Sequence, residues 1–70
     1  MKKIIDFIID QKLESINEYP TLIQPIANEF NIDFGIAKGI INTVIEWECS
    51  NTPDCLEEVL VRKFPSVVTN

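Results

Sequence analysis

Apart from its carboxylates, this 70-residue chain has few side chains that could do chemistry. It contains eleven Asp and Glu residues, two cysteines and two glycines, and it has no histidine. It has no glycine-rich phosphate loop, and no serine, cysteine or lysine lies at a motif spacing from a plausible base. Paired carboxylates need a deep cleft to become useful acids or bases, and so short a chain has little room for one. We therefore expect no catalytic residue, no cofactor and no small-molecule substrate.

The two cysteines, Cys49 and Cys55, flank the segment SNTPD. They could pack as small core side chains, form a disulfide under oxidising conditions, or take part in an intermolecular metal or redox contact. A zinc site normally needs four soft ligands, so two cysteines without histidine make a poor one. We expect the chain to form no metal site.

Three carboxylates, Asp6, Asp10 and Glu14, recur at intervals of four residues, which places them on one face of a helix. Like charges at this spacing repel each other by about 0.2–0.5 kcal/mol per pair. One interpretation is a solvated helix face. The other is a negative surface that binds a basic site on another protein, including the DNA-binding groove of a larger enzyme.

The elements that must position these residues are predicted from apolar periodicity. Apolar side chains recur at intervals of three and four within residues 2–17, 21–30, 33–48 and 53–63. The predicted fold class is all-α, a small single-domain bundle of about four short helices within residues 1–70. The third helix has the widest apolar face, with Ile40 at its middle, so we expect it to be the central helix.

Helix ends are indicated by residues with particular backbone preferences. Pro25 is compatible only with the first turn of the second helix. Asn31 suits a left-handed turn, and Asp33 suits the N-cap of the third helix. For the fourth helix, Thr52 is the expected N-cap and Pro53 the expected first residue.

Composition and charge restrict the partners. The apolar run IIDFII, residues 4–9, is broken by Asp6 and lacks a small-residue cleavage site, so it resembles neither a signal peptide nor a membrane span. The net charge of −5 opposes attraction to nucleic acid and to anionic membranes. We expect a soluble cytoplasmic protein without membrane contact, for which DNA is a disfavoured partner.

Residues 24–43 resemble the helix-turn-helix of phage repressors and Cro-like proteins. In that family a small residue lies where the two helices cross, and Ala27 occupies this position. Asn31 stands where the turn usually has glycine. Apolar residues match those that flank the turn in the family: Ile26, Phe30, Ile32, Ala37 and Ile40. The resemblance implies a helix-turn-helix-like unit within the bundle.

The surface that would contact DNA in this family fits DNA poorly here. The outward positions of the second helix of the unit are Asp33, Phe34, Gly35, Lys38, Gly39 and Asn42. Base recognition relies on Arg, Lys, Gln, Asn, Ser and Thr near the helix start, backed by cations at the phosphates. Only Lys38 and Asn42 offer such groups.

Gly35 and Gly39 lie four residues apart and leave a smooth strip on the third helix. Glycine inside a helix costs about 1 kcal/mol relative to alanine, so two of them need a reason. Either the first or fourth helix of the same chain crosses there, or a partner helix or a second copy binds there with Phe34 as its anchor. In the second case, Gly39→Leu should leave the protein folded and abolish binding.

Two functional hypotheses follow. The leading one is a small acidic, non-enzymatic protein-binding module that acts by stoichiometric contact with another protein or with a second copy of itself. Phage-encoded inhibitors and immunity-type proteins have this size and charge, which suits an inhibitor or regulator from a phage or mobile element. The predicted contact residues are Phe34, Gly35, Lys38, Gly39, Asn42, Asp6, Asp10 and Glu14.

The alternative is a dimeric helix-turn-helix transcriptional regulator that binds DNA through the third helix. The distribution of cations discriminates between the two hypotheses. The regulator would be favoured by a fold that brings four cations to one surface beside the third helix: Lys12, Lys38, Arg62 and Lys63.

Overall fold

The computed structural model describes residues 2–50 and 53–67, without the side chain of Ser66. These residues form four α-helices and two short 3₁₀ segments: α1 Lys2–Asp10, η1 Ile16–Leu22, α2 Ile23–Phe30, α3 Phe34–Ser50, α4 Leu56–Lys63 and η2 Pro65–Val67. No strand occurs within the described ranges. The predicted all-α fold class is confirmed. None of the helices in this part of the chain is both long and apolar enough to cross a membrane.

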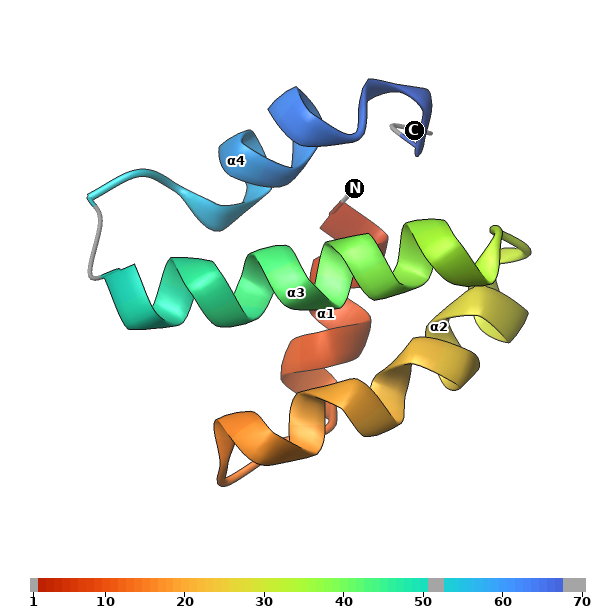
Figure 1. Cartoon of the computed structure of the whole chain (residues 1–70), viewed down its shortest axis with the longest axis horizontal. Coiled ribbons are helices and arrows are strands. Elements are labelled where there is room, and N and C mark those ends of the chain that lie inside the picture. The colour runs from red at the N-terminus through yellow and green to blue at the C-terminus, as the bar shows by residue number, and fades with distance from the viewer. Residues whose placement is uncertain (1, 51–52, 68–70) are drawn as a thin grey trace.

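Helix α3 lies at the centre of the molecule (Figure 1). In this view η1 and α2 run along one side of α3, α4 lies along the opposite side, and α1 crosses α3. Five side chains with no exposed surface come from α2, α3 and α4: Ile26, Ala37, Ile40, Ile41 and Leu60. The third helix is therefore the central one, as its apolar face predicts.

Helix α1 joins the core through one face. Ile4 and Ile8, one turn apart, keep only 4% and 5% of their surface exposed. On the same side, the Phe7 ring meets the Phe30 ring of α2 edge to face, with centroids 5.7 Å apart and planes at 87°. These contacts fix the position of α1 against α2.

The turn between α2 and α3 forms as its residues predict. Asn31 has φ 52 and ψ 48, the left-handed conformation. The N–H groups of Asn31 and Ile32 both donate to the Ala27 carbonyl, which satisfies the end of α2. One carboxylate oxygen of Asp33 accepts the Gly35 N–H at 2.9 Å and so caps the start of α3.

The predicted first helix, residues 2–17, is wrong in length because α1 ends at Asp10. Lys12 adopts φ 52, which no α-helix permits. Ser15 then starts η1 with a capping box. Its hydroxyl accepts the Asn17 N–H at 3.2 Å, while the Glu18 carboxylate accepts the Ser15 N–H at 3.1 Å. This local start signal overrides the apolar spacing that continues past Asp10.

The predicted second helix, residues 21–30, is shorter at its start because residues 16–22 are 3₁₀ and α2 begins at Ile23. Pro20 lies inside η1. Pro25 is the third residue of α2, where its missing N–H has no intrahelical partner to lose, as predicted. The third predicted helix, residues 33–48, starts one residue early and ends two residues early, because α3 runs from Phe34 to Ser50.

The predicted fourth helix, residues 53–63, starts too early. Helix α4 begins at Leu56 with Cys55 at its N-cap, and the expected cap, Thr52, lies outside the described residues. Pro53 is in a bend instead of the first turn. The indole N–H of Trp47 donates to the Asp54 carbonyl at 2.7 Å and so holds this bend against α3. Helix α4 starts two residues after Asp54. Helix α4 ends at Lys63, as predicted.

Candidate functional site

The three predicted acidic residues do not form one stripe, because α1 is too short. Asp6 and Asp10 are exposed on α1, whereas Glu14 lies in the connection to η1. There its N–H donates to the Glu18 carboxylate at 3.1 Å. The prediction of a continuous acidic helix face is therefore wrong, and only Asp6 of the three contributes to the groove described below.

Four of the five predicted contact residues on α3 are exposed: Phe34, Gly35, Lys38 and Asn42. Phe34 keeps 51% of its surface exposed, which is high for an aromatic side chain. The four residues occupy the first half of α3, on its solvent-facing side. They form an exposed surface, and none of them lines the cavity described below.

The two glycines of α3 have separate surroundings. A Cβ atom on Gly39 would lie 3.0 Å from the ring of Phe64, the residue that follows α4. A segment of the same chain therefore covers Gly39, which takes it out of the predicted contact surface. A Cβ atom on Gly35 would lie 3.0 Å from the Asp33 carboxylate, the group that caps α3. Contacts within the chain therefore give a reason for both glycines.

Two of the four cations that would support DNA binding are paired with glutamates. Arg62 pairs with a glutamate of its own helix at 2.9 Å, and Lys63 pairs with Glu46 at 3.9 Å. Lys12 lies beside the second half of α3, where it shares a cavity wall with residues of that half, whereas Lys38 lies in the first half. Lys12 and Lys38 therefore lie at different halves of α3, while Arg62 and Lys63 are engaged by carboxylates.

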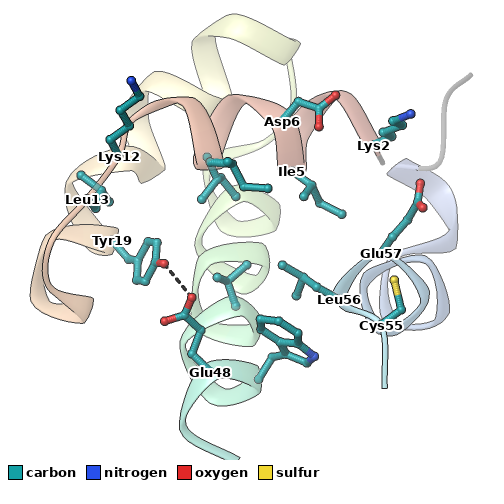
Figure 2. Close-up of a pocket in the computed structure, with 14 residues that line it drawn as sticks. Lys2, Ile5, Asp6, Lys12, Leu13, Tyr19, Glu48, Cys55, Leu56 and Glu57 are labelled. Carbon is teal, nitrogen blue, oxygen red and sulfur yellow. Dashed lines mark hydrogen bonds between the residues drawn. The ribbon is translucent and has the colours of Figure 1, made fainter. Parts of the chain in front are cut away.

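An open cavity of about 650 Å³ lies between α1, η1, the second half of α3 and the start of α4 (Figure 2). We call it the groove. Most of its lining is apolar or aromatic, and its charged groups stand at the rim. The lining residues are Lys2, Ile5, Asp6, Ile8, Ile9, Lys12, Leu13, Tyr19, Val44, Trp47, Glu48, Cys55, Leu56 and Glu57.

The groove lies beside the crossing of α1 over α3, where the second half of α3 is left uncovered by α1 (Figure 1). Helix α1 has 9 residues and α3 has 17, so α1 is about 13 Å long and α3 about 25 Å. The chain turns away after α1, at the left-handed residue Lys12, and the second half of α3 extends beyond it. Tyr19 of η1 and Leu56 of α4 then stand on opposite sides of the uncovered space (Figure 2).

One polar contact fixes a wall of the groove. The Tyr19 hydroxyl donates a hydrogen bond of 3.0 Å to Oε1 of Glu48, and so links η1 to α3 (Figure 2). Burial raises the pKa of Tyr19 above its ordinary value of 10.0, and the hydrogen bond to Glu48 and the negative charge of Glu48 raise it further. The phenol is therefore a firm donor at neutral pH, and Glu48 is held in one orientation.

Apolar side chains on the groove are exposed to an unusual degree. Ile9 keeps 66% of its surface exposed, more than Phe34 with 51% and Val61 with 36%. Ile5, Leu13 and Leu56 are partly buried and pack against the core from the same region. Large apolar side chains grouped around a hollow are typical of a binding surface.

Asp6 is the one predicted contact residue that lines the groove. Tyr19, Trp47, Glu48 and Leu56 come from three different elements, and no spacing in the sequence brings them together. One local signal was available. The sequence Ser-Ile-Asn-Glu at residues 15–18 is a capping-box pattern, which places a chain break before it and leaves Ile9 near the end of a short helix.

The groove is lined by apolar, aromatic, charged and thiol side chains. The described residues contain no group of three or more His, Cys, Asp and Glu side chains that could hold a metal ion. Cys55 lines the groove and Cys49 is exposed on α3, and both are free thiols.

Comparisons with protein-family models, with curated proteins and with solved structures found no match to this chain.

Proposed function

We propose that this protein is a small, non-enzymatic binding module that holds another protein in the groove by stoichiometric contact. The observation that carries the proposal is Ile9, which keeps 66% of its surface exposed beside an apolar hollow of about 650 Å³. Such a surface gains free energy when a partner covers it, because apolar area leaves water. The module acts in the cytoplasm as an inhibitor or regulator in this proposal, in line with the sequence-based prediction.

The openness of the groove supports a macromolecular partner over a small molecule. Small-molecule sites enclose most of their ligand, whereas here Ile9 stands largely in solvent at the wall. The lining comes from α1, η1, α3 and α4 and offers a broad apolar floor with charges at its edge. The side of a helix from another protein suits this shape, as in other helix-in-groove complexes.

A capture experiment with two variants tests the proposed function. The tagged protein is used to isolate its partner from the source cells, alongside Ile9→Lys, which places a charge on the groove, and Phe34→Ala, which alters the exposed surface of α3. Both residues are exposed, so both variants should keep the wild-type circular dichroism spectrum. Loss of the partner with Ile9→Lys and retention with Phe34→Ala are expected. The opposite pattern would move the contact surface to α3 and contradict the proposal.

A DNA-binding regulator is the second candidate. The observation in its favour is that Lys38 and Asn42, the two groups able to bond to bases, are both exposed on α3, the second helix of the resembling unit. Against it stand the net charge of −5 and the pairing of Arg62 and Lys63 with glutamates. The protein-binding function is therefore preferred.

A further inference from the structure

We propose that the groove takes a basic amphipathic helix, whose apolar face covers Ile9 and Leu56 and one of whose Lys or Arg side chains pairs with Glu48. The inference rests on the proposed function, because it names the chemistry of the partner that the groove holds.

Charge is the first argument for a basic partner. The molecule carries a net charge of −5, and the rim of the groove adds three carboxylates, Asp6, Glu48 and Glu57, to two lysines. A cationic partner is attracted by this field and binds faster, whereas an acidic one is repelled. A second copy of the chain would bring another −5 to the interface, so self-association is disfavoured by the same field.

Glu48 is the second argument, because it is oriented before a partner arrives. Its Oε1 accepts the Tyr19 hydroxyl at 3.0 Å, while no described residue donates to its other oxygen, Oε2. Glu48 is exposed and lines the groove together with Val44, Trp47 and Leu13, so a partner that covers these apolar side chains also reaches the carboxylate. A Lys or Arg that reaches Oε2 forms a charge-assisted hydrogen bond, which is stronger where water is excluded.

The same arrangement discriminates against other partners. An apolar or acidic helix that covered the groove would remove water from the Glu48 carboxylate without replacing its hydrogen bonds. Such an uncompensated buried charge is strongly unfavourable. Lys2 lies at the start of α1, on the side of Glu57, and Lys12 lies two residues after the end of α1, on the side of Tyr19 (Figure 2). These lysines can pair with carboxylates at the edges of a basic helix.

Synthetic peptides of about 14 residues test the partner class directly. The probe is a Leu/Lys peptide with Leu at helical intervals of three and four. One control is a Leu/Glu peptide with the same Leu positions, and the other is a Leu/Lys peptide of scrambled order. Trp47 is the sole tryptophan of the chain and lines the groove, so its emission reports binding to Trp-free peptides. The amphipathic basic peptide should bind at 1:1 and change the emission, with much weaker effects from both controls.

Two isosteric variants separate the local contact from the overall charge. Glu48→Gln should weaken binding of the basic peptide about tenfold, a loss typical of a charge-assisted contact. Glu46→Gln removes the same charge from the same helix, but Glu46 faces Lys63 and does not line the groove. Its effect should stay within about twofold, since exposed ion pairs contribute little. Both glutamates are exposed, so both variants should fold, and circular dichroism verifies this.

Several results would overturn the inference. Equal binding of the acidic and basic peptides, no binding of the basic peptide, or equal losses in Glu48→Gln and Glu46→Gln would each do so. A different result would contradict the proposed function, namely that the Ile9→Lys variant still captures the partner. A partner that is lost with Ile9→Lys but unaffected by Glu48→Gln would leave the groove as the binding site and contradict only the basic-helix partner.

Discussion

Tyr19 and Glu48 are 29 residues apart in the sequence, and their hydrogen bond joins η1 to α3 at one wall of the groove. Neither residue belongs to a recognisable motif. Each becomes significant only when the fold brings the phenol to the carboxylate, which no periodicity encodes. By contrast, Asn31 and Asp33 were predicted correctly, because their roles depend on the backbone of adjacent residues.

The titration of Tyr19 tests this contact. Tyr19 is the only tyrosine, so its ionisation is seen in the ultraviolet absorbance without overlap from another phenol. Its midpoint should lie above 10.0, because burial raises the pKa first and Glu48 adds to it. Glu48→Gln removes the charge and should lower the pKa, while burial keeps it above the ordinary value. Glu46→Gln, the matched control, should leave the midpoint unchanged.

The same shift fixes the sign of a stability effect. The pKa of Tyr19 is raised in the folded protein, so the native state holds this proton more tightly than the unfolded chain does. The contribution to stability is present in full below pH 10 and is lost as the pH rises through the raised pKa. A wild-type midpoint at or below 10.0, or one that Glu48→Gln does not move, would show that the contact is absent in solution.

Two chemically identical substitutions compare the core with the groove. Ile40 has no exposed surface, so Ile40→Ala should lower the free energy of unfolding by about 2–5 kcal/mol. Ile9 keeps 66% of its surface, so Ile9→Ala should change it by no more than about 0.5 kcal/mol. Urea denaturation followed by circular dichroism measures both. Similar losses in the two variants would mean that Ile9 is a core residue and that the groove is closed.

At the scale of elements, the positions of the helices were predictable and several of their ends were not. Helix α3 follows from its wide apolar face, and α4 ends at Lys63, two residues before Pro65. Helix α1 was predicted seven residues too long, because the apolar spacing through Leu13 and Ile16 outweighed the Ser15–Glu18 capping box. That error hid the groove, because the chain turns away at Lys12, and η1 then forms one side of the groove.

The contact between α3 and the end of α4 changes one sequence-based expectation. Gly39→Leu was expected to leave the protein folded, but a Cβ atom there would lie 3.0 Å from the Phe64 ring. The leucine must displace Phe64, and overpacking of this kind costs about 1–3 kcal/mol. We therefore expect a lower melting temperature for Gly39→Leu and no loss for Asn42→Leu, an exposed control on the same helix.

The Phe64→Ala variant tests whether the Phe64 ring is what obstructs the leucine in Gly39→Leu. In Phe64→Ala, the space beside Gly39 is free, so adding Gly39→Leu should no longer lower the melting temperature relative to Phe64→Ala alone. Equal losses in both backgrounds would mean that the leucine meets some other obstacle and that Phe64 does not cover Gly39.

At the scale of the whole molecule, charge decides between the two candidate functions. The chain has six basic and eleven acidic residues, and two of the basic ones, Arg62 and Lys63, are paired with glutamates. Few cations are left to displace the counterions of DNA, and this displacement supplies most of the affinity for nucleic acid. A gel-shift series should therefore show little or no binding of duplex DNA at physiological salt. Nanomolar, sequence-specific binding that Lys38→Ala abolishes would contradict this prediction.

The location of the partner is the most direct test of the groove. The ¹⁵N-labelled protein is titrated with its captured partner, and the amide and indole N–H signals are followed by NMR. Trp47 gives the only indole signal, and it lies on the groove. We predict that this signal shifts on binding, together with the amides of Ile9, Leu13 and Tyr19. Shifts confined to Phe34, Lys38 and Asn42 on α3, with the indole unmoved, would contradict the account.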